Sequence, residues 1–229
     1  MEMQDLESIR PEMDGERYMY NGISVPRVTS IISKTIHEDY LLQWANSLGF
    51  KRKGYTKTLN EAADYGTRTH KGLELFLKGE DIPLGTPINP IDGFKQWWAL
   101  INEGNDVKIL GQEQKLVCPW FGGTYDMLLC INGKNYMVDF KTSNHLSYKY
   151  CLQLAAYNYI IKHEISLSGI IILQLDKKYP TFNEFVLDFG NPNHAEFFSF
   201  CEETFLSLVY SYYHILETEK RYKTLNKVG

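Results

Sequence analysis

Long hydrophobic runs are absent from this chain of 229 residues. Its longest aliphatic stretch, residues 170–173, is far shorter than the ~18 apolar residues that a membrane-spanning helix needs. The first seven residues are acidic and have neither the basic region nor the apolar stretch of a signal peptide. We therefore expect a cytoplasmic protein without a membrane partner.

Cysteine is scarce, and its spacing does not match the common metal-binding motifs. No two cysteines form a C-x-x-C pair, so neither a zinc ribbon nor a thioredoxin-like redox pair is expected. Without a secretion signal, we expect reduced and mostly buried thiols. The four cysteines are Cys118, Cys130, Cys151 and Cys201.

Positive charge is in slight deficit, with 24 Lys and Arg against 28 Asp and Glu and a formal net charge of −4. This excludes a uniformly basic nucleic-acid coat. The charge is uneven, however: residues 1–16 carry −5, and Lys51–Lys71 carries +4. The second segment is either a solvated run of charges or a surface that contacts phosphate. Its candidate DNA-binding residues are Lys51, Arg52, Lys53, Tyr55, Lys57, Arg68 and Lys71.

Hydrophobic periodicity divides the chain into helices and strands. The patterns predict helices over 60–78, 91–103, 148–163 and 194–222, and strands over 108–118, 124–131, 135–141, 169–175 and 181–187. We expect Thr29 or Ser30 to begin a short helix, a further helix from Asp39 to Leu48, and Asn193 as N-cap of the last helix. This order predicts an α/β fold, with a central mixed sheet flanked by helices.

The predicted domain organisation is a flexible acidic tail, residues 1–16, and one domain, 17–229. Within that domain, 17–105 is expected to be mainly helical and to contact DNA. Residues 106–190 are expected to form the sheet core with the active site, and 191–229 the C-terminal helix.

An Asn-Gly dipeptide at 132–133 separates two β-patterned runs and predicts a tight hairpin. Such a loop pairs residue 131 with 134, which places Asp126 directly opposite Asp139. Lys141 lies two residues further along the strand and points to the same face.

Two carboxylates placed in this way are about 5 Å apart and repel each other by roughly 3 kcal/mol at an effective dielectric of ~20. A favourable cross-strand pair contributes only ~0.2–1 kcal/mol, so a purely structural role is disfavoured. A divalent cation between the acids, or a proton on one of them, would remove the repulsion. Oxygen ligands favour Mg²⁺ or Mn²⁺. The alternative is an exposed hairpin whose acids are splayed or paired with Lys141.

Five segments, in this order along the chain, resemble the RecB-like branch of the PD-(D/E)XK nuclease superfamily. This branch includes phage-type exonucleases and the mitochondrial genome maintenance exonuclease. The segments are Val25–Ile32, Gly66–His70 followed by Glu74, Gly122–Asp126, Val138–Ser143 and Gln153–Tyr157.

The resemblance implies a restriction-endonuclease-like core with an N-terminal helical region. It implies that His70, Asp126 and Asp139 bind Mg²⁺ or Mn²⁺ together with the backbone carbonyl of Phe140, and it makes Glu113 a further candidate ligand. Lys141 would position or activate the attacking water. The implied catalytic residues are Asp126, Asp139, Lys141, Gln153 and Tyr157. No iron–sulfur cluster is expected, because the four-cysteine arrangement of some related nucleases is missing.

Two candidate residues keep alternative interpretations. His70 could be an ordinary surface histidine of the 60–78 helix. Glu74, one turn further on, could either support His70 or be a solvated acid. Of the neighbouring Trp97 and Trp98, we expect at least one to lie in the core, because adjacent helical residues point about 100° apart.

The activity implied by the resemblance is a metal-dependent DNA exonuclease. It would hydrolyse phosphodiester bonds of single-stranded or free-ended DNA in recombination, repair or replication. A structure-specific or sequence-specific endonuclease with the same site is one alternative, and a non-catalytic DNA-binding or assembly protein is another. A phage origin, which the resemblance also suggests, would place the protein in the host cytoplasm.

Overall fold

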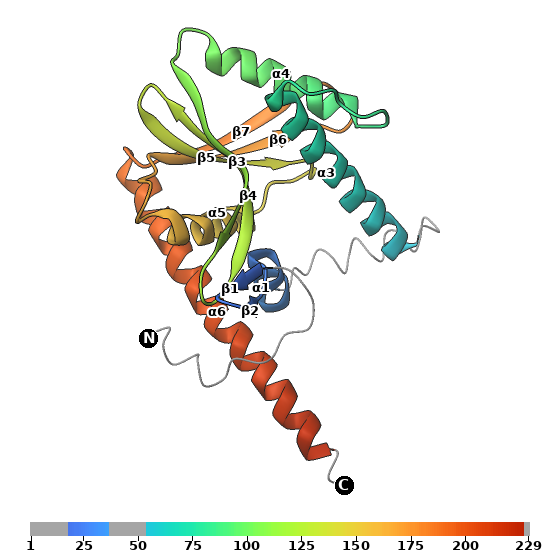
Figure 1. The fold of residues 1–229 in the computed structure, drawn as a ribbon, viewed down its shortest axis with the longest axis vertical. Coiled ribbons are helices and arrows are strands. Elements are labelled where there is room, and N and C mark those ends of the chain that lie inside the picture. Colours follow the sequence, from blue (N-terminus) through green and yellow to red (C-terminus); the bar gives the residue numbers. More distant parts are fainter. Residues whose placement is uncertain (1–17, 37–53, 227–229) are drawn as a thin grey trace.

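Figure 1 shows the computed structural model, in which residues 18–36 and 54–226 are described. These residues form a two-stranded sheet, β1–β2, and a five-stranded sheet in the order β3-β4-β5-β6-β7. The strands are β1 Tyr18–Tyr20, β2 Ile23–Val25, β3 Val107–Val117, β4 Gly122–Ile131, β5 Lys134–Lys141, β6 Gly169–Leu175 and β7 Phe182–Asp188. The helices are α1 Val28–Thr35, α3 Tyr55–Lys78, α4 Ile88–Asn102, α5 Tyr148–Ile161 and α6 Pro192–Asn226.

The five-stranded sheet is mixed. β3, β4 and β5 pair antiparallel, β5 and β6 pair parallel, and β6 and β7 pair antiparallel. The parallel pair is connected by α5, as a parallel connection requires. The predicted α/β fold with a mixed sheet flanked by helices is confirmed, and it is consistent with a restriction-endonuclease-like core. The domain boundaries stay a prediction.

Helices cover both faces of this sheet (Figure 1). α3 and α4 pack on one face, where Leu73, Phe94 and Trp97 are buried against the sheet. α1, α5 and α6 pack on the other, where Leu154 and Phe205 are fully buried. Trp97 therefore belongs to the core, as expected for at least one residue of the tryptophan pair.

The hairpin β4–β5 has the predicted register. Asn132 and Gly133 have φ values of 50° and 80°, the left-handed conformations that a two-residue hairpin turn requires. Ile131 pairs with Lys134, and the ladder continues to Met127 opposite Val138. Asp126 and Asp139 lie one step beyond that pair, so the turn sets their relative position.

Several helix boundaries differ from the predicted ones. α3 begins at Tyr55, five residues before the predicted start. The N-cap of α1 is Arg27, and no side chain caps the helix, so the predicted cap at Thr29 or Ser30 is wrong. For α6 the cap is Asn191, not Asn193: the Asn191 Oδ1 accepts a hydrogen bond from the Asn193 N–H at 3.0 Å.

The α6 start can be explained in hindsight. Pro192 suits the first helical position because its missing N–H would be unpaired there anyway. The predicted tail, 1–16, and the predicted helix at 39–48 lie outside the described residues.

α6 is 35 residues long, and in Figure 1 its C-terminal part runs past the sheet and beyond α1. An ion pair of 3.0 Å between Lys34 Nζ and Glu219 Oε1 connects α1 to this part of the helix. Among the described residues, none of the helices combines the length and apolar character needed for a bilayer crossing. All four cysteines carry free thiols, and all but Cys130 are buried.

Candidate active site

Asp126 on β4 is the centre of a small polar network in an apolar part of the fold. His70 Nδ1 on α3 lies 3.2 Å from Asp126 Oδ1. The Phe140 backbone N–H on β5 donates to Asp126 Oδ2 at 2.6 Å. Both carboxylate oxygens are therefore held, one by the helix and one by the neighbouring strand. Asp126 is only 8% exposed, so this buried charge depends on these partners.

Glu113 on β3 lies near His70 and Asp126 and has an unusual backbone conformation. Gln112 pairs with Met127 and Gln114 pairs with Tyr125, so Glu113 lies opposite Asp126 in the β3–β4 ladder. Its φ is 48°, in the left-handed region that is unfavourable for a non-glycine residue by roughly 1–2 kcal/mol. Strain of this kind concentrates at functional sites, where the rest of the fold maintains it.

Three side chains, His70, Glu113 and Asp126, form a group that fits a metal ion. One ligand atom from each lies within 4.8 Å of the other two. A cation with oxygen ligands at about 2.0–2.6 Å can contact atoms up to about 5 Å apart. The donor set of one imidazole nitrogen and carboxylate oxygens suits Mn²⁺ or Mg²⁺ better than a soft thiophilic metal.

Asp139 and Lys141 form a second, adjoining cluster on β5. Lys141 Nζ donates to Asp139 Oδ1 at 2.9 Å and lies 2.7 Å from Asp139 Oδ2. The Oδ2 atom is buried and, despite that ionic contact, makes no hydrogen bond of acceptable geometry within the described residues. A buried carboxylate oxygen in this condition is rare in folded proteins and indicates a place for a further ligand.

Gln153 on α5 connects this cluster to Tyr157. Its Nε2 donates to Asp139 Oδ1 at 3.3 Å and to the Tyr157 hydroxyl at 3.1 Å, and its Oε1 lies 3.4 Å from Lys141 Nζ. The Tyr157 ring lies against Gly123 on β4, where any added Cβ would overlap it. The two residues therefore act together, as their spacing of four on one helix predicts.

Burial and neighbouring charges shift the pKa values of His70 and of the acidic residues in different directions. Burial would lower the pKa of His70, but the Asp126 carboxylate outweighs it and raises that pKa to about 8. Burial raises the pKa of Glu113 to about 7, and Asp126 adds to the effect. Burial also raises the pKa of Asp139 to about 6, although Lys141 acts in the opposite direction. For Asp126, His70 and then Lys141 outweigh burial and hold the pKa below its ordinary value.

The candidate metal site opens onto a surface cavity of about 560 Å³. His70 and Glu113 line it together with Lys71 and Glu74 of α3 and with two residues at the start of α1, Arg27 and Thr29. The remaining lining residues are Gly66 and Thr67. Arg27 and Thr29 are candidates to which the sequence assigned no role in the site. Their only signal was membership of the segment at 25–32 that resembles the nuclease branch.

The structure distributes the predicted site residues over two clusters. His70 and Asp126 are brought together with Glu113, and Asp139 lies outside this group, joined to Lys141, Gln153 and Tyr157 instead. Asp139 and the Phe140 carbonyl therefore stay predictions as metal ligands. Glu74 does not contact His70, because its carboxylate oxygens pair with Lys71 and Lys78.

The predicted DNA-binding segment is only partly described. Lys51, Arg52, Lys53 and the Tyr55 side chain lie outside the described residues. The other three cations are exposed on α3 and paired with acids. Lys57 Nζ lies 4.0 Å from Glu61, Arg68 Nε lies 2.9 Å from Asp64, and Lys71 Nζ lies 2.8 Å from Glu74. Exposed pairs of this kind contribute little to stability and separate readily.

The chain was compared with protein families, curated proteins and solved structures. No family model and no curated protein matches the chain. A solved structure titled SSO0001 aligns with 90% of this chain and 82% of its own, at 14% identity and a TM-score of 0.38. An alkaline exonuclease (LHK-Exo) from Laribacter hongkongensis aligns with 63% of this chain and 79% of its own, at 12% identity and a TM-score of 0.34. Likenesses of this size carry no functional conclusion.

Proposed function

We propose that this protein is a metal-dependent DNA exonuclease of the PD-(D/E)XK type, acting on single-stranded or free-ended DNA. One observation carries the proposal. A His–Glu–Asp group with the geometry of a cation site, at an open cavity, adjoins a partly buried lysine that an aspartate and a glutamine hold in place. Metal-dependent phosphodiester hydrolysis uses these two elements, a cation site and a positioned positive charge.

His70, Glu113 and Asp126 would hold the metal, Mg²⁺ or Mn²⁺. When bound, such an ion would lower the pKa of a coordinated water and neutralise negative charge on the phosphate. Asp126 keeps His70 oriented through the contact between its Oδ1 and the imidazole Nδ1. The Phe140 N–H holds the other oxygen, so the Asp126 carboxylate cannot rotate freely.

Lys141 would position the attacking water and stabilise the charge that develops on the phosphate. Its ammonium group is fixed by Asp139 and Gln153, and its pKa is raised, since Asp139 and Asp126 outweigh the opposite effect of burial. The ammonium therefore stays charged at neutral pH. Preorganised charge in a site of low dielectric contributes more to transition-state stabilisation than a mobile charge in water.

Cleavage of end-labelled linear and of circular single-stranded DNA, each with Mg²⁺, Mn²⁺ or EDTA, tests this function. We expect cleavage of the linear strand only, dependent on metal and abolished by Asp126→Asn. Equal cleavage of the circle would favour the endonuclease alternative. Metal-independent or absent cleavage by a folded protein would contradict the proposal.

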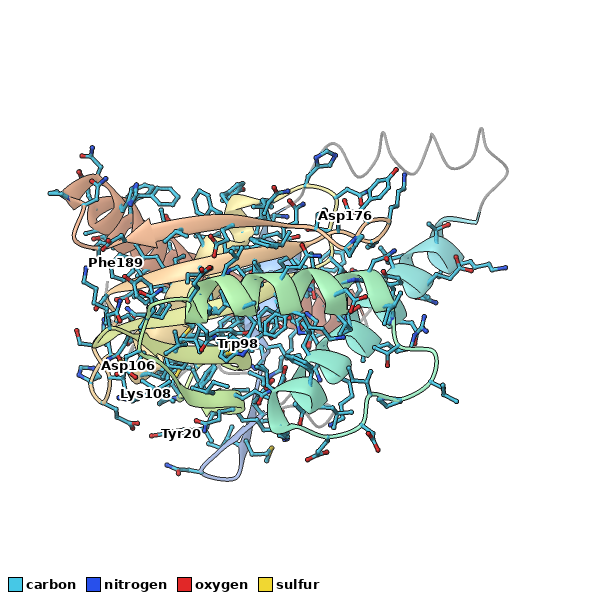
Figure 2. The ribbon with its side chains drawn as sticks, turned by 90° about the horizontal axis from the view of Figure 1, so that it is seen from above. Tyr20, Trp98, Asp106, Lys108, Asp176 and Phe189 are labelled. Carbon is cyan, nitrogen blue, oxygen red and sulfur yellow. The ribbon has the colours of Figure 1, made fainter. Side chains whose placement is uncertain are left out.

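The chain contains a matched control for the Asp139-Phe140-Lys141 element. Asp106 and Lys108 have the same spacing and form an ion pair of 2.8 Å, but both side chains are about two-thirds exposed. Figure 2 shows them at the end of the sheet opposite Asp176. Lys108→Ala should leave the cleavage rate unchanged, whereas Lys141→Ala should reduce it on the order of 10²-fold or more.

A further inference from the structure

The turn between β6 and β7, residues 176–181, lies close to the candidate active site. β6 runs parallel to β5, and Gln174 on β6 is the cross-strand partner of Lys141. Lys177 follows three residues later, which corresponds to about 10 Å at ~3.3 Å per residue. Figure 2 shows Asp176 at the end of the sheet opposite Asp106, Lys108 and Phe189.

This turn is held in one conformation by its own hydrogen bonds. Asp176 Oδ1 accepts from the backbone N–H groups of Lys178 at 2.6 Å and Tyr179 at 3.0 Å. The Asp176 N–H donates to the Thr181 carbonyl at 3.0 Å. An aspartate that bonds its own following backbone in this way restricts a turn to a defined shape.

Two helices anchor the same turn from outside. Tyr65 on α3 and Asn89 on α4 both donate to the Lys177 carbonyl, at 3.4 and 3.2 Å. Gln96 on α4 donates to the Pro180 carbonyl at 2.8 Å. The turn is therefore hydrogen-bonded to α3, the helix on which His70 lies five residues after Tyr65.

The side chains that this fixed turn presents to solvent are mainly aromatic and basic, and the one exposed acid, Asp176, accepts hydrogen bonds from the backbone of the turn itself. Tyr179 is 65% exposed, and its ring has no aromatic or cation partner among the described residues. Lys178 is exposed, and the Lys177 ammonium lies 5.2 Å from the centroid of the Tyr65 ring. Within the described part of the chain, neither lysine forms an ion pair. Packing does not explain why a tyrosine with so little burial is placed on a fixed turn.

We propose that Tyr179, together with Lys177, Lys178 and Tyr65, forms a platform that binds single-stranded nucleic acid on its way to the active site. A base would stack on the Tyr179 ring, and the two ammonium groups would contact the phosphates on either side. Stacking on an exposed aromatic residue beside lysines that form no ion pair within the described residues accepts any base and requires a strand whose bases are free. The proposal rests on the proposed function, because it names the form of substrate that reaches that site.

The direct test is the affinity for a fluorescent single-stranded oligonucleotide, measured by anisotropy in EDTA so that no cleavage occurs. Tyr179→Ala should weaken binding by about fivefold or more, whereas Tyr179→Phe should keep it. Tyr222→Ala is the matched control, because Tyr222 on α6 is also 65% exposed. Unchanged affinity for Tyr179→Ala, or an equal loss for Tyr222→Ala, would overturn the platform, as would a wild-type protein that binds no single strand.

Two further measurements separate stacking from charge. Lys177→Ala and Lys178→Ala should each reduce the dependence of log K on log salt concentration by about 0.7, whereas Tyr179→Ala should leave that slope unchanged. The second measurement uses a series of oligonucleotides in which an abasic nucleotide replaces one position at a time. At one of these positions, wild type and Tyr179→Ala should bind with equal affinity, because the base that stacks on the ring is missing. If their affinities differ at every position, the ring does not stack on a base.

The experiments can disprove the platform proposal and the nuclease proposal independently of each other. If the protein cleaves DNA in a metal-dependent way and Tyr179→Ala binds the strand normally, only the platform is wrong. If binding of single strands depends on Tyr179 but no cleavage occurs with any metal, the nuclease proposal is wrong and the platform remains.

Discussion

Glu113 and Asp126 face each other across the β3–β4 ladder, and of the two only Glu113 has a left-handed backbone conformation. Glu113 has a strained backbone and Asp126 is buried, and both belong to the same candidate metal site as His70. Because strain and burial both oppose stability, the pair makes physical sense if something binds there. Four predictions examine this site.

The first prediction concerns the strain at Glu113. Glu113→Gly should not lower the metal-free melting temperature, because glycine adopts a φ of 48° without steric penalty. The rise in melting temperature on adding Mn²⁺ should be lost, since a ligand is removed. Lys115→Gly, two residues along the same strand where φ is not positive, should instead be destabilising by roughly 0.5–1 kcal/mol. Glu113→Gly with an undiminished Mn²⁺ effect would show that Glu113 is not a ligand.

The second prediction concerns the pH dependence of stability without metal. The pKa of His70 is raised from 6.5 to about 8, so its stabilising contribution is complete below pH 6.5 and disappears as the pH rises through 8. The pKa values of Glu113 and Asp139 are raised from 4.5 to about 7 and from 3.8 to about 6. These acids too hold protons more tightly in the folded state, so their ionisation destabilises the fold.

In EDTA, the melting temperature should therefore fall as the pH rises from about 5 to about 8.5. With Mn²⁺ the stabilisation should increase over the same range, because ligands must lose protons to bind a metal. Asp126→Asn should remove the contribution of His70 to this decrease in melting temperature, which lies between pH 6.5 and 8. A metal-free melting temperature that rises through this range would contradict the assignment.

The third prediction separates metal binding from chemistry. Lys141→Ala should reduce the cleavage rate on the order of 10²-fold or more, while the affinity for Mn²⁺, measured by calorimetry, changes little. The reason is that Lys141 contacts Asp139 and Gln153 and lies outside the His70–Glu113–Asp126 group. Asp126→Asn should reduce both quantities. If Lys141→Ala loses metal affinity to the same extent, the two clusters form one site.

The fourth prediction compares two glycines near the site. Gly123→Ala should destabilise the fold by about 1–3 kcal/mol, because the new Cβ would overlap the Tyr157 ring and displace Gln153. For Gly66→Ala, the new Cβ would lie 3.7 Å from Thr142 Oγ1, an ordinary contact. In the interior of α3 this change should stabilise by roughly 0.5–1 kcal/mol. Chemical denaturation of both variants checks the opposite signs.

The sequence predicted local parts of this structure well. The Asn-Gly turn at 132–133 determines the hairpin register, so the relation between Asp126 and Asp139 follows from counting residues. The spacing of Gln153 and Tyr157 likewise placed both on one helix face. The fold class followed from the alternation of strand and helix periods, and Gly169–Leu175 was predicted with its observed bounds.

Other parts depend on packing that no local pattern encodes. The ladder register shifts between Ile109 and Gly111, and Glu113 adopts its left-handed conformation further along the same strand. Gly111 is a residue type that often marks a bulge in a strand, but no local pattern predicts the left-handed conformation of Glu113, so Glu113 could only be a candidate. The contact of His70 with Asp126 requires α3 to pack on β4, and only the family resemblance suggested it. The cap at Arg27 was missed because Thr29 and Ser30, which are more typical capping residues, follow it closely. The cap at Asn191 was missed because a second asparagine, Asn193, lies two residues further on.

The position of His70 on α3, far in sequence from Asp126, has a consequence for how activity appears during folding. The β4–β5 hairpin is closed by a local turn and forms few contacts between distant residues, so it can form early. The cation site needs α3 to dock on β4 and β3 to add Glu113, and Lys141 needs Gln153 from the α5 connection. A partly folded chain therefore has only a fraction of the site. The protein should gain the ability to cut nucleic acid only as its last long-range contacts form.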